Sequence, residues 1–124
     1  MLTLPPSVRI YLAAQPVDMR KGFDGLMAIV RAWQLDPFTG DLFVFCSRSR
    51  TRLKVLHWDH GGFVLTYKRL EAGTFRVPFP KPGATQLRLD STQLALLLDG
   101  IDFSRVRRPR RWMPAQGIDK TAPM

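Results

Sequence analysis

The sequence has one cysteine, few acidic residues and no long apolar run. Because Cys46 is alone among 124 residues, no disulfide can form within the chain. It lies in an apolar segment, where a free thiol is usually buried and unreactive. No segment approaches the roughly twenty apolar residues that span a bilayer, and the N-terminus does not resemble a signal peptide. We therefore expect a cytoplasmic protein that does not contact a membrane.

The sequence also lacks the patterns of common catalytic and metal sites. Its ten acidic residues are scattered singly, so no pair of carboxylates forms an evident acid–base couple. The glycines lack the spacing and the following lysine of a phosphate-binding loop. His57, Asp59 and His60 could suggest a metal site, but no further histidine or cysteine lies near them, and a hairpin end with polar residues explains them better. We expect no catalysis, no metal and no cofactor.

Positive charge, in contrast, is in excess. Nineteen Lys and Arg residues against ten Asp and Glu give a formal charge of +9, which indicates a polyanionic partner such as nucleic acid. Six basic residues and one acidic residue lie in residues 104–124. This stretch has no steady apolar period, so we expect a flexible arginine-rich arm in which Trp112 provides one stacking anchor; the alternative is an ordinary solvated tail.

Residues 1–103 are expected to form one domain that contains a sheet. Residues 8–13 alternate between apolar and other side chains, as in a half-buried strand. Residues 42–46 are apolar on both faces, which is typical of an inner strand. Residues 52–59 and 63–68 flank a glycine-containing turn and predict a hairpin.

Two helices complete the predicted domain. Residues 19–34 carry apolar side chains at spacings of three and four, and Asp18 is expected to cap this helix. Asp90 or Ser91 should cap a second, short helix, with Gln93 placed to reach back to Asp90, and residues 74–77 could add a short edge strand. The expected fold is α+β: a small, mainly antiparallel sheet of about four to five strands, one helix packed on it, a short C-terminal helix and a basic C-terminal arm.

Several basic residues are candidates for contact with phosphate. Arg52, Lys54 and Trp58 share one face of a predicted strand and are expected to point outward. Arg20 and Lys21 oppose the helix dipole; they form a second phosphate seat or simply pair with Asp24 on a solvated surface. The full set of expected nucleic-acid contacts is Arg20, Lys21, Arg48, Arg50, Arg52, Lys54, Trp58, Lys68, Arg69, Arg105, Arg107, Arg108, Arg110 and Arg111.

Ordered motifs over roughly residues 8–103 resemble a known family. They are Met19-Arg20-Lys21-Gly22-Phe23-Asp24-Gly25-Leu26, Asp36-Pro37-Phe38 with Gly40, Leu42-Phe43-Val44-Phe45, Arg52-Leu53-Lys54, Trp58-Asp59, Gly62-Phe63 and Tyr67-Lys68-Arg69-Leu70-Glu71. Together they resemble the TnpB accessory proteins of IS-sixty-six type insertion sequences, which are distinct from the RNA-guided nucleases of the same name. The chain departs from the family in the turn 46–51, which lacks a glycine or aspartate, and at His57, where an aromatic residue is usual.

The resemblance implies a bacterial protein that acts beside a separate transposase in DNA transposition and joins the nucleoid when bound to DNA. We expect a non-catalytic subunit that binds the element ends or the target, with the transposase and other accessory proteins as partners. One alternative is a protein adaptor for the transposase that does not touch DNA. A second is a small metal-dependent nuclease that uses His57, Asp59 and His60. The choice between DNA and RNA and the oligomeric state stay open.

Overall fold

A computed structural model describes residues 7–100 of the chain. The arm expected over residues 104–124 lies outside the described residues, together with its five candidate arginines. The elements follow in the order β1 (Ile10–Ala13), α1 (Phe23–Ala32), β2 (Leu42–Cys46), β3 (Arg52–Asp59), β4 (Gly62–Arg69), β5 (Gln86–Leu89) and α2 (Ser91–Leu98).

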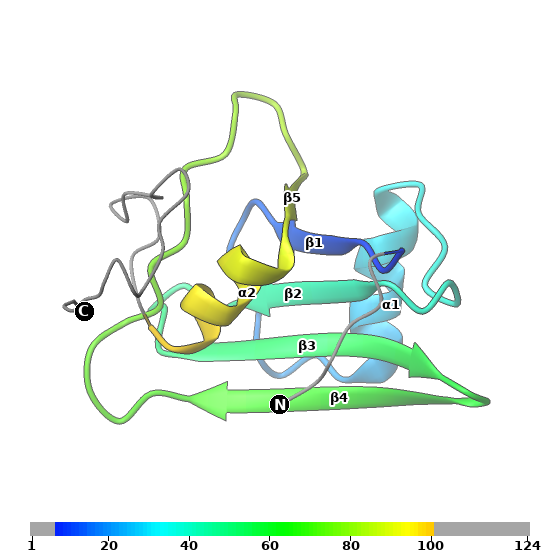
Figure 1. Cartoon of the computed structure of the whole chain (residues 1–124), viewed down its shortest axis with the longest axis horizontal. Helices are drawn as coiled ribbons and strands as arrows, with labels where there is room; N and C mark the ends of the chain where they lie inside the picture. The colour runs from blue at the N-terminus through cyan, green and yellow to red at the C-terminus, as the bar shows by residue number, and fades with distance from the viewer. Residues whose placement is uncertain (1–6, 101–124) are drawn as a thin grey trace, which may run out of the picture.

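The strands form one sheet in the order β4-β3-β2-β1-β5 (Figure 1). β1 and β2 are parallel, whereas β2–β3, β3–β4 and β1–β5 are antiparallel. A parallel pair needs a crossover connection, and α1 supplies it between β1 and β2. The mainly antiparallel sheet and the α+β class are therefore confirmed, with one βαβ unit at the centre.

Both faces of the sheet are covered, with α2 in front and α1 behind in Figure 1. On the α1 face, Phe43 and Phe45 pack with Leu26 and Val30 of the helix, while Phe75 and Leu97 belong to the core on the opposite face; the side chains named here are almost entirely buried. The residues of β1 alternate between these two cores, so the expectation that this strand is buried on one face only is wrong. The inner strand predicted at residues 42–46 is confirmed, and Cys46 is buried within it.

The ends of the helices differ in how well they match the sequence pattern. α1 begins at Phe23 rather than at residue 19, and its cap is Gly22, which offers no side-chain hydrogen bond. The expected cap, Asp18, instead accepts a hydrogen bond from the backbone N–H of Arg20 at 2.9 Å. α2 agrees with the prediction, because Asp90 and Gln93 form a reciprocal capping box.

The connection from β4 to β5 must cross from one edge of the sheet to the other. The edge strand expected at residues 74–77 is not formed; Phe75 is instead fully buried in the core, and its backbone N–H donates to the carbonyl oxygen of Arg50 at 2.7 Å. The edge strand next to β1 is instead β5, which was not predicted. Phe75 therefore anchors the long loop that leads to β5.

Replacing this anchor should destabilise the protein, whereas a neighbouring phenylalanine should not matter for stability. Phe75→Ala removes a fully buried ring and should lower the free energy of unfolding by about 3–5 kcal/mol. Phe79→Ala is the matched control, because Phe79 is 92% exposed, and its effect should stay within about 0.5 kcal/mol. Urea denaturation of both variants measures the difference, and equal midpoints would show that Phe75 does not anchor the loop.

Candidate nucleic-acid interface

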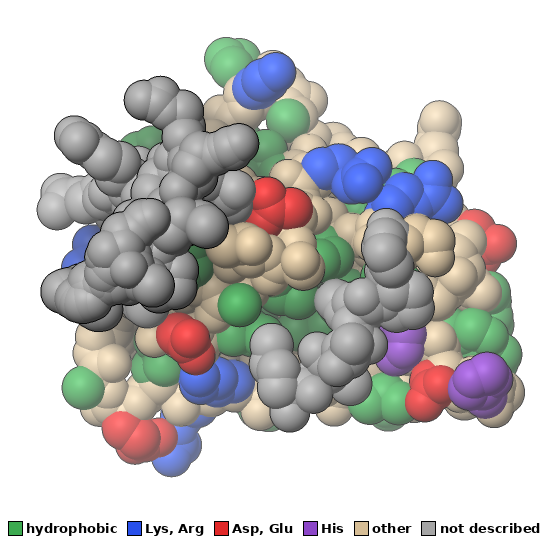
Figure 2. Space-filling view, viewed as in Figure 1, with side chains coloured by type: hydrophobic (Ala, Val, Ile, Leu, Met, Phe, Trp, Pro, Cys, Tyr) green, Lys and Arg blue, Asp and Glu red, His purple; other side chains and the backbone are tan. Residues whose placement is uncertain are grey.

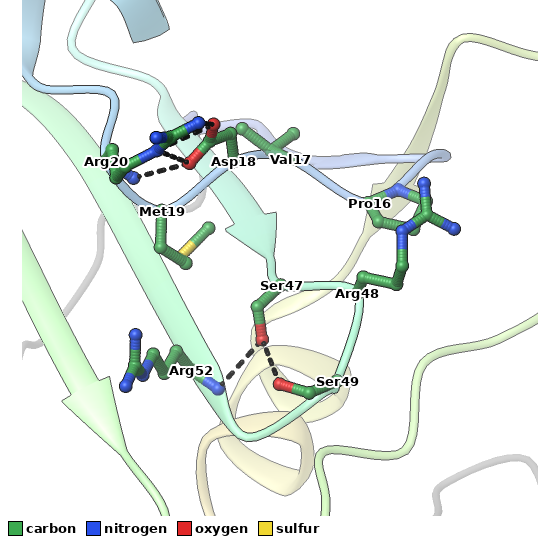
Figure 3. Close-up of a pocket in the computed structure, with 9 residues that line it drawn as sticks. All are labelled: Pro16, Val17, Asp18, Met19, Arg20, Ser47, Arg48, Ser49 and Arg52. Atoms are coloured by element: carbon green, nitrogen blue, oxygen red, sulfur yellow. Dashed lines mark hydrogen bonds and ion pairs between the residues drawn. The ribbon is translucent and has the colours of Figure 1, made fainter.

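The loop after β1 and the turn after β2 meet at one end of the sheet, because the two strands are parallel. Between them lies a shallow hollow of about 700 Å³ (Figure 3). It is lined by Pro16, Val17, Asp18, Met19, Arg20, Ser47, Arg48, Ser49 and Arg52. Three of the predicted contact arginines therefore share one hollow, although they come from two separate segments.

The arginines surround the hollow instead of converging at its centre. Figure 3 shows Arg48 and Arg52 extending to opposite sides, with Arg20 on the far rim. Arg50 lines a smaller adjoining hollow that shares Pro16 and Ser47 with the first. All four arginines are exposed.

The turn between β2 and β3 is fixed by its own hydroxyl groups. Ser47 Oγ accepts from the backbone N–H of Arg52 at 3.2 Å and lies 3.2 Å from Ser49 Oγ. Arg50 has a φ of 62° and its N–H donates to the Ser47 carbonyl oxygen at 3.0 Å. The glycine missing from this turn is thus replaced by an arginine in the left-handed conformation, which is unfavourable for a residue with a Cβ.

Arg20 is paired with Asp18 rather than with the expected Asp24. Its guanidinium Nη2 donates to Asp18 Oδ2 at 2.7 Å, and Nε donates to both carboxylate oxygens at 3.1 Å. These hydrogen bonds lower the pKa of Asp18 from 3.8 to about 2. Arg20 and Lys21 also precede α1, so the expected placement of both in its first turn is wrong.

Lys54 does not point outward, so the prediction that it shares an exposed face with Arg52 and Trp58 is wrong. It is 8% exposed, and its ammonium donates to the carbonyl oxygens of Met19 at 2.7 Å and Lys21 at 2.9 Å. The same nitrogen lies 4.9 Å from the ring centroid of Tyr67, its partner across the β3–β4 ladder. Lys54 therefore ties the segment before α1 to the sheet, and alternation along β3 could not reveal that this segment covers it.

Trp58 also departs from the expected outward orientation. It is half-buried, and its ring centroid lies 5.0 Å from that of Phe38 and 4.9 Å from that of Phe63. At about 3.3 Å per residue, Trp58 lies roughly 20 Å along β3 from Arg52. The arginines and this indole thus occupy opposite ends of the strand and do not form one surface.

Strand pairing places two further predicted contact residues, Lys68 and Arg69, at the same end of the sheet as these arginines. Arg69 is the direct cross-strand partner of Arg52, and Lys68 pairs with the adjacent Leu53. Arg69 Nε lies 2.9 Å from Glu71 Oε2, and the Lys68 ammonium donates to the Leu98 carbonyl oxygen. Two arginines directly opposite each other repel, so this arrangement is not one that stability alone favours.

Three further features considered from the sequence can be checked in the described residues: a metal site, the reactivity of the cysteine and a membrane-spanning helix. Within residues 7–100, no three His, Cys, Asp or Glu side chains gather as potential metal ligands. Burial raises the pKa of the Cys46 thiol to about 11, as expected for an unreactive cysteine. No helix in the described part of the chain is long and apolar enough to cross a membrane.

These features define a small α+β protein with a central βαβ unit and with basic residues in the loops at one end of the sheet. The chain belongs to the family described as IS66 Orf2 like protein, which matches residues 8–108. The family resemblance expected from the sequence motifs is thereby confirmed, and it associates the chain with IS66-type transposition.

Two curated proteins of Sinorhizobium fredii (strain NBRC 101917 / NGR234) are similar to this chain. It is 43% identical over 102 residues to the uncharacterized protein y4jC, an alignment that covers 82% of this chain and 86% of y4jC. It is 38% identical over 118 residues to the uncharacterized protein y4hO, with 94% and 98% covered. No solved structure matches the chain significantly.

Removing the ammonium of Lys54 should destabilise the fold. Lys54→Met keeps the apolar stem but leaves the carbonyl oxygens of Met19 and Lys21 without their donor, so the free energy of unfolding should fall by about 2 kcal/mol. Arg52→Met, two residues earlier and exposed, is the control and should change it by less than about 0.5 kcal/mol. Chemical denaturation compares the two variants; a Lys54→Met protein as stable as the wild type would contradict the role of this tether.

The depressed pKa of Asp18 should depend on Arg20. In Arg20→Gln, an NMR titration of the carboxyl carbon should show the Asp18 pKa rising from about 2 toward its ordinary 3.8, whereas Arg48→Gln should leave it nearly unchanged. Because the folded pKa is lowered, the pair stabilises the protein above about pH 4, and this contribution disappears as the pH falls toward 2. A midpoint that stays near 2 in Arg20→Gln would show that another group holds the carboxylate ionised.

Proposed function

We propose that this protein is a non-catalytic accessory subunit of transposition that binds DNA through the loop end of its sheet. The observation that carries the proposal is the assembly of cations from three separate segments at that end. We call this surface the basic end; it comprises Arg20, Lys21, Arg48, Arg50, Arg52, Lys68 and Arg69.

The electrostatics of the basic end favour a polyanionic ligand. Among the described residues, Arg48, Arg50 and Arg52 form no ion pair with a carboxylate. Arg52 and Arg69 are also held as direct neighbours across the ladder. Phosphate groups would relieve this repulsion, because each would bring a negative charge close to the two cations.

The spread of the cations suits a phosphate backbone better than a single phosphate. Arg48 and Arg52 extend to opposite sides of an open hollow (Figure 3), so the two would contact different phosphates. On the face that carries α2, the Lys and Arg side chains visible in Figure 2 likewise lie apart from one another and mostly toward the margin. Contacts of this kind position a nucleic acid without reading its sequence.

The described helices offer no evident means of reading bases in the major groove. α1 and α2 pack on opposite faces of the sheet, so they do not form the adjacent pair of a helix-turn-helix. Sequence selection at element ends would then come from the partner transposase or from the shape of the DNA. This protein would add affinity and hold the DNA in place.

A protein adaptor for the transposase is the second candidate, and one observation favours it. Phe38, Trp58 and Phe63 form an aromatic cluster at the hairpin end of the sheet, and Phe38 is 44% exposed. Exposed aromatic side chains are frequent anchors of protein interfaces. Because this cluster lies at the opposite end from the cations, the two candidate functions can be tested with separate variants.

Binding to duplex DNA of the element ends should weaken steeply with salt. About six phosphate contacts predict a loss of roughly a thousandfold in affinity between 50 and 200 mM salt. The double variant Arg48→Gln/Arg52→Gln should bind more weakly and reduce the slope of log affinity against log salt by about two. Electrophoretic mobility shifts over a series of salt concentrations measure both quantities, with duplex RNA as a parallel ligand.

The control for this experiment is Arg31→Gln, because Arg31 lies near Phe38, with its guanidinium carbon 6.0 Å from the ring centroid. It should leave the salt slope unchanged. A flat salt response of the wild-type protein, or no binding at low salt, would refute the DNA-binding proposal. Capture of the transposase that is lost on Phe38→Ala but kept in the arginine double variant would instead support the adaptor.

A further inference from the structure

The loop between β4 and β5 carries a phenylalanine that the fold does not use. Phe79 is 92% exposed, more than any other large hydrophobic residue in the described part of the chain. The loop projects from the sheet at the top of Figure 1. Exposing a phenyl ring to water forgoes the stabilisation that burial would give, so the ring is available to a ligand or partner.

The backbone on both sides of Phe79 is restricted. Pro78 precedes it and Pro80 follows it, so the chain has fixed φ values at its neighbours and a strong preference for an extended conformation at Phe79 itself. A segment that is already extended loses less conformational entropy on binding than a flexible loop. The prolines thus favour the presentation of the ring over its collapse onto the core.

Both ends of this loop are attached beside the basic end. Val77 and Pro78 line the smaller hollow together with Arg50. On the return, the carbonyl oxygen of Thr85 accepts from the N–H of Ala14, at 3.0 Å. Since Phe79 directly follows Pro78, its backbone begins next to the hollow that Arg50 lines.

Two cations flank the ring in sequence. Arg76 and Lys81 are both exposed, and neither forms a salt bridge within residues 7–100. An aromatic ring between unpaired cations suits a nucleic acid, in which flat bases alternate with charged phosphates along the strand. A nucleic acid would use both the charges and the ring in one repeating arrangement.

We propose that Phe79 contacts the face of a nucleobase in the nucleic acid held at the basic end. This inference rests on the proposed function and adds an apolar contact to it. The base could belong to a single strand, on which the ring would stack, or to a duplex step that the ring would enter as a wedge. In either case, Arg76 and Lys81 would hold the neighbouring phosphates.

The test uses the full chain and measures the affinity of Phe79→Ala for a single-stranded oligonucleotide and for a duplex at constant salt. For at least one of the two ligands, affinity should fall by about 5- to 150-fold, the range typical of a lost stacked base. The salt slope should stay as in the wild type, because no cation is removed. Phe79→Trp should bind that ligand as tightly as the wild type does.

Two more variants sharpen the result. If the ring acts as a duplex wedge, Phe79→Leu should bind the duplex more tightly than Phe79→Ala does. If the ring stacks on a single-stranded base, Phe79→Leu should bind the single strand as weakly as Phe79→Ala does. Val64→Ala removes a half-exposed apolar side chain from β4 and should leave the affinity for both ligands unchanged. Far-UV circular dichroism and urea midpoints show that each variant is folded.

The inference fails if the wild type binds nucleic acid with the expected salt slope and Phe79→Ala binds both ligands as tightly as the wild type does. It also fails if Phe79→Ala binds normally but no longer captures the transposase, because the loop would then be a protein anchor. If the wild type binds neither oligonucleotide, the proposed function falls as well. The wild-type salt series therefore separates the two failures.

Discussion

β1 and β2 run parallel to each other, and this pairing determines where the crossover helix and the basic loops lie. Ile10, Tyr11 and Leu12 pair with Leu42, Phe43 and Val44 in the middle of the sheet. Two parallel strands cannot be joined by a tight turn, so the chain must cross one face, and α1 forms in that crossing. The carboxyl ends of both strands then lie at one end of the sheet, where the loop 14–22 meets the turn 47–51. The ammonium of Lys54 in β3 stabilises this arrangement by donating hydrogen bonds to the carbonyl oxygens of residues 19 and 21.

This arrangement separates two kinds of surface. Cations gather where β1 and β2 end, whereas the aromatic cluster around Trp58 lies at the hairpin between β3 and β4. The two surfaces lie roughly 20 Å apart along β3. The proposed contact with DNA and the alternative contact with a transposase would therefore involve different residues.

The sequence predicted the local features of the fold well. β2, the β3–β4 hairpin and the capping box of α2 follow from apolar periodicity and from cap residues that are neighbours in sequence. The sequence did not predict the β1–β2 pairing, because nothing local specifies which distant strand lies alongside. β5 was missed for a related reason: it is four residues long, follows a proline-rich loop and contains the exposed Arg88.

The candidate site was predicted less completely than the fold. Alternation assigned Lys54 to a face of β3 but could not show that the segment before α1 covers that face. The pairing of Arg52 with Arg69 depends on the exact length of the hairpin turn. A two-residue turn at His60 and Gly61 places these residues opposite each other, whereas the turn predicted over residues 60–62 would shift the register by one residue.

The sequence around Phe79 is informative about the backbone but not about burial. The residue stands between two prolines and near two cations. Prolines on both sides indicate a loop, but they do not show whether the ring is buried. The structure adds that the ring is exposed and that the preceding Pro78 lines a hollow together with Arg50.

The most direct test of the central claim is amide hydrogen exchange, followed by mass spectrometry, with and without duplex DNA from the element ends. Our account predicts slower exchange in residues 14–22 and 47–52 when DNA is bound, and no change around Phe38 or in the hairpin turn at residues 59–62. Slower exchange confined to the hairpin end, or none at the basic end under conditions in which DNA is bound, would contradict it.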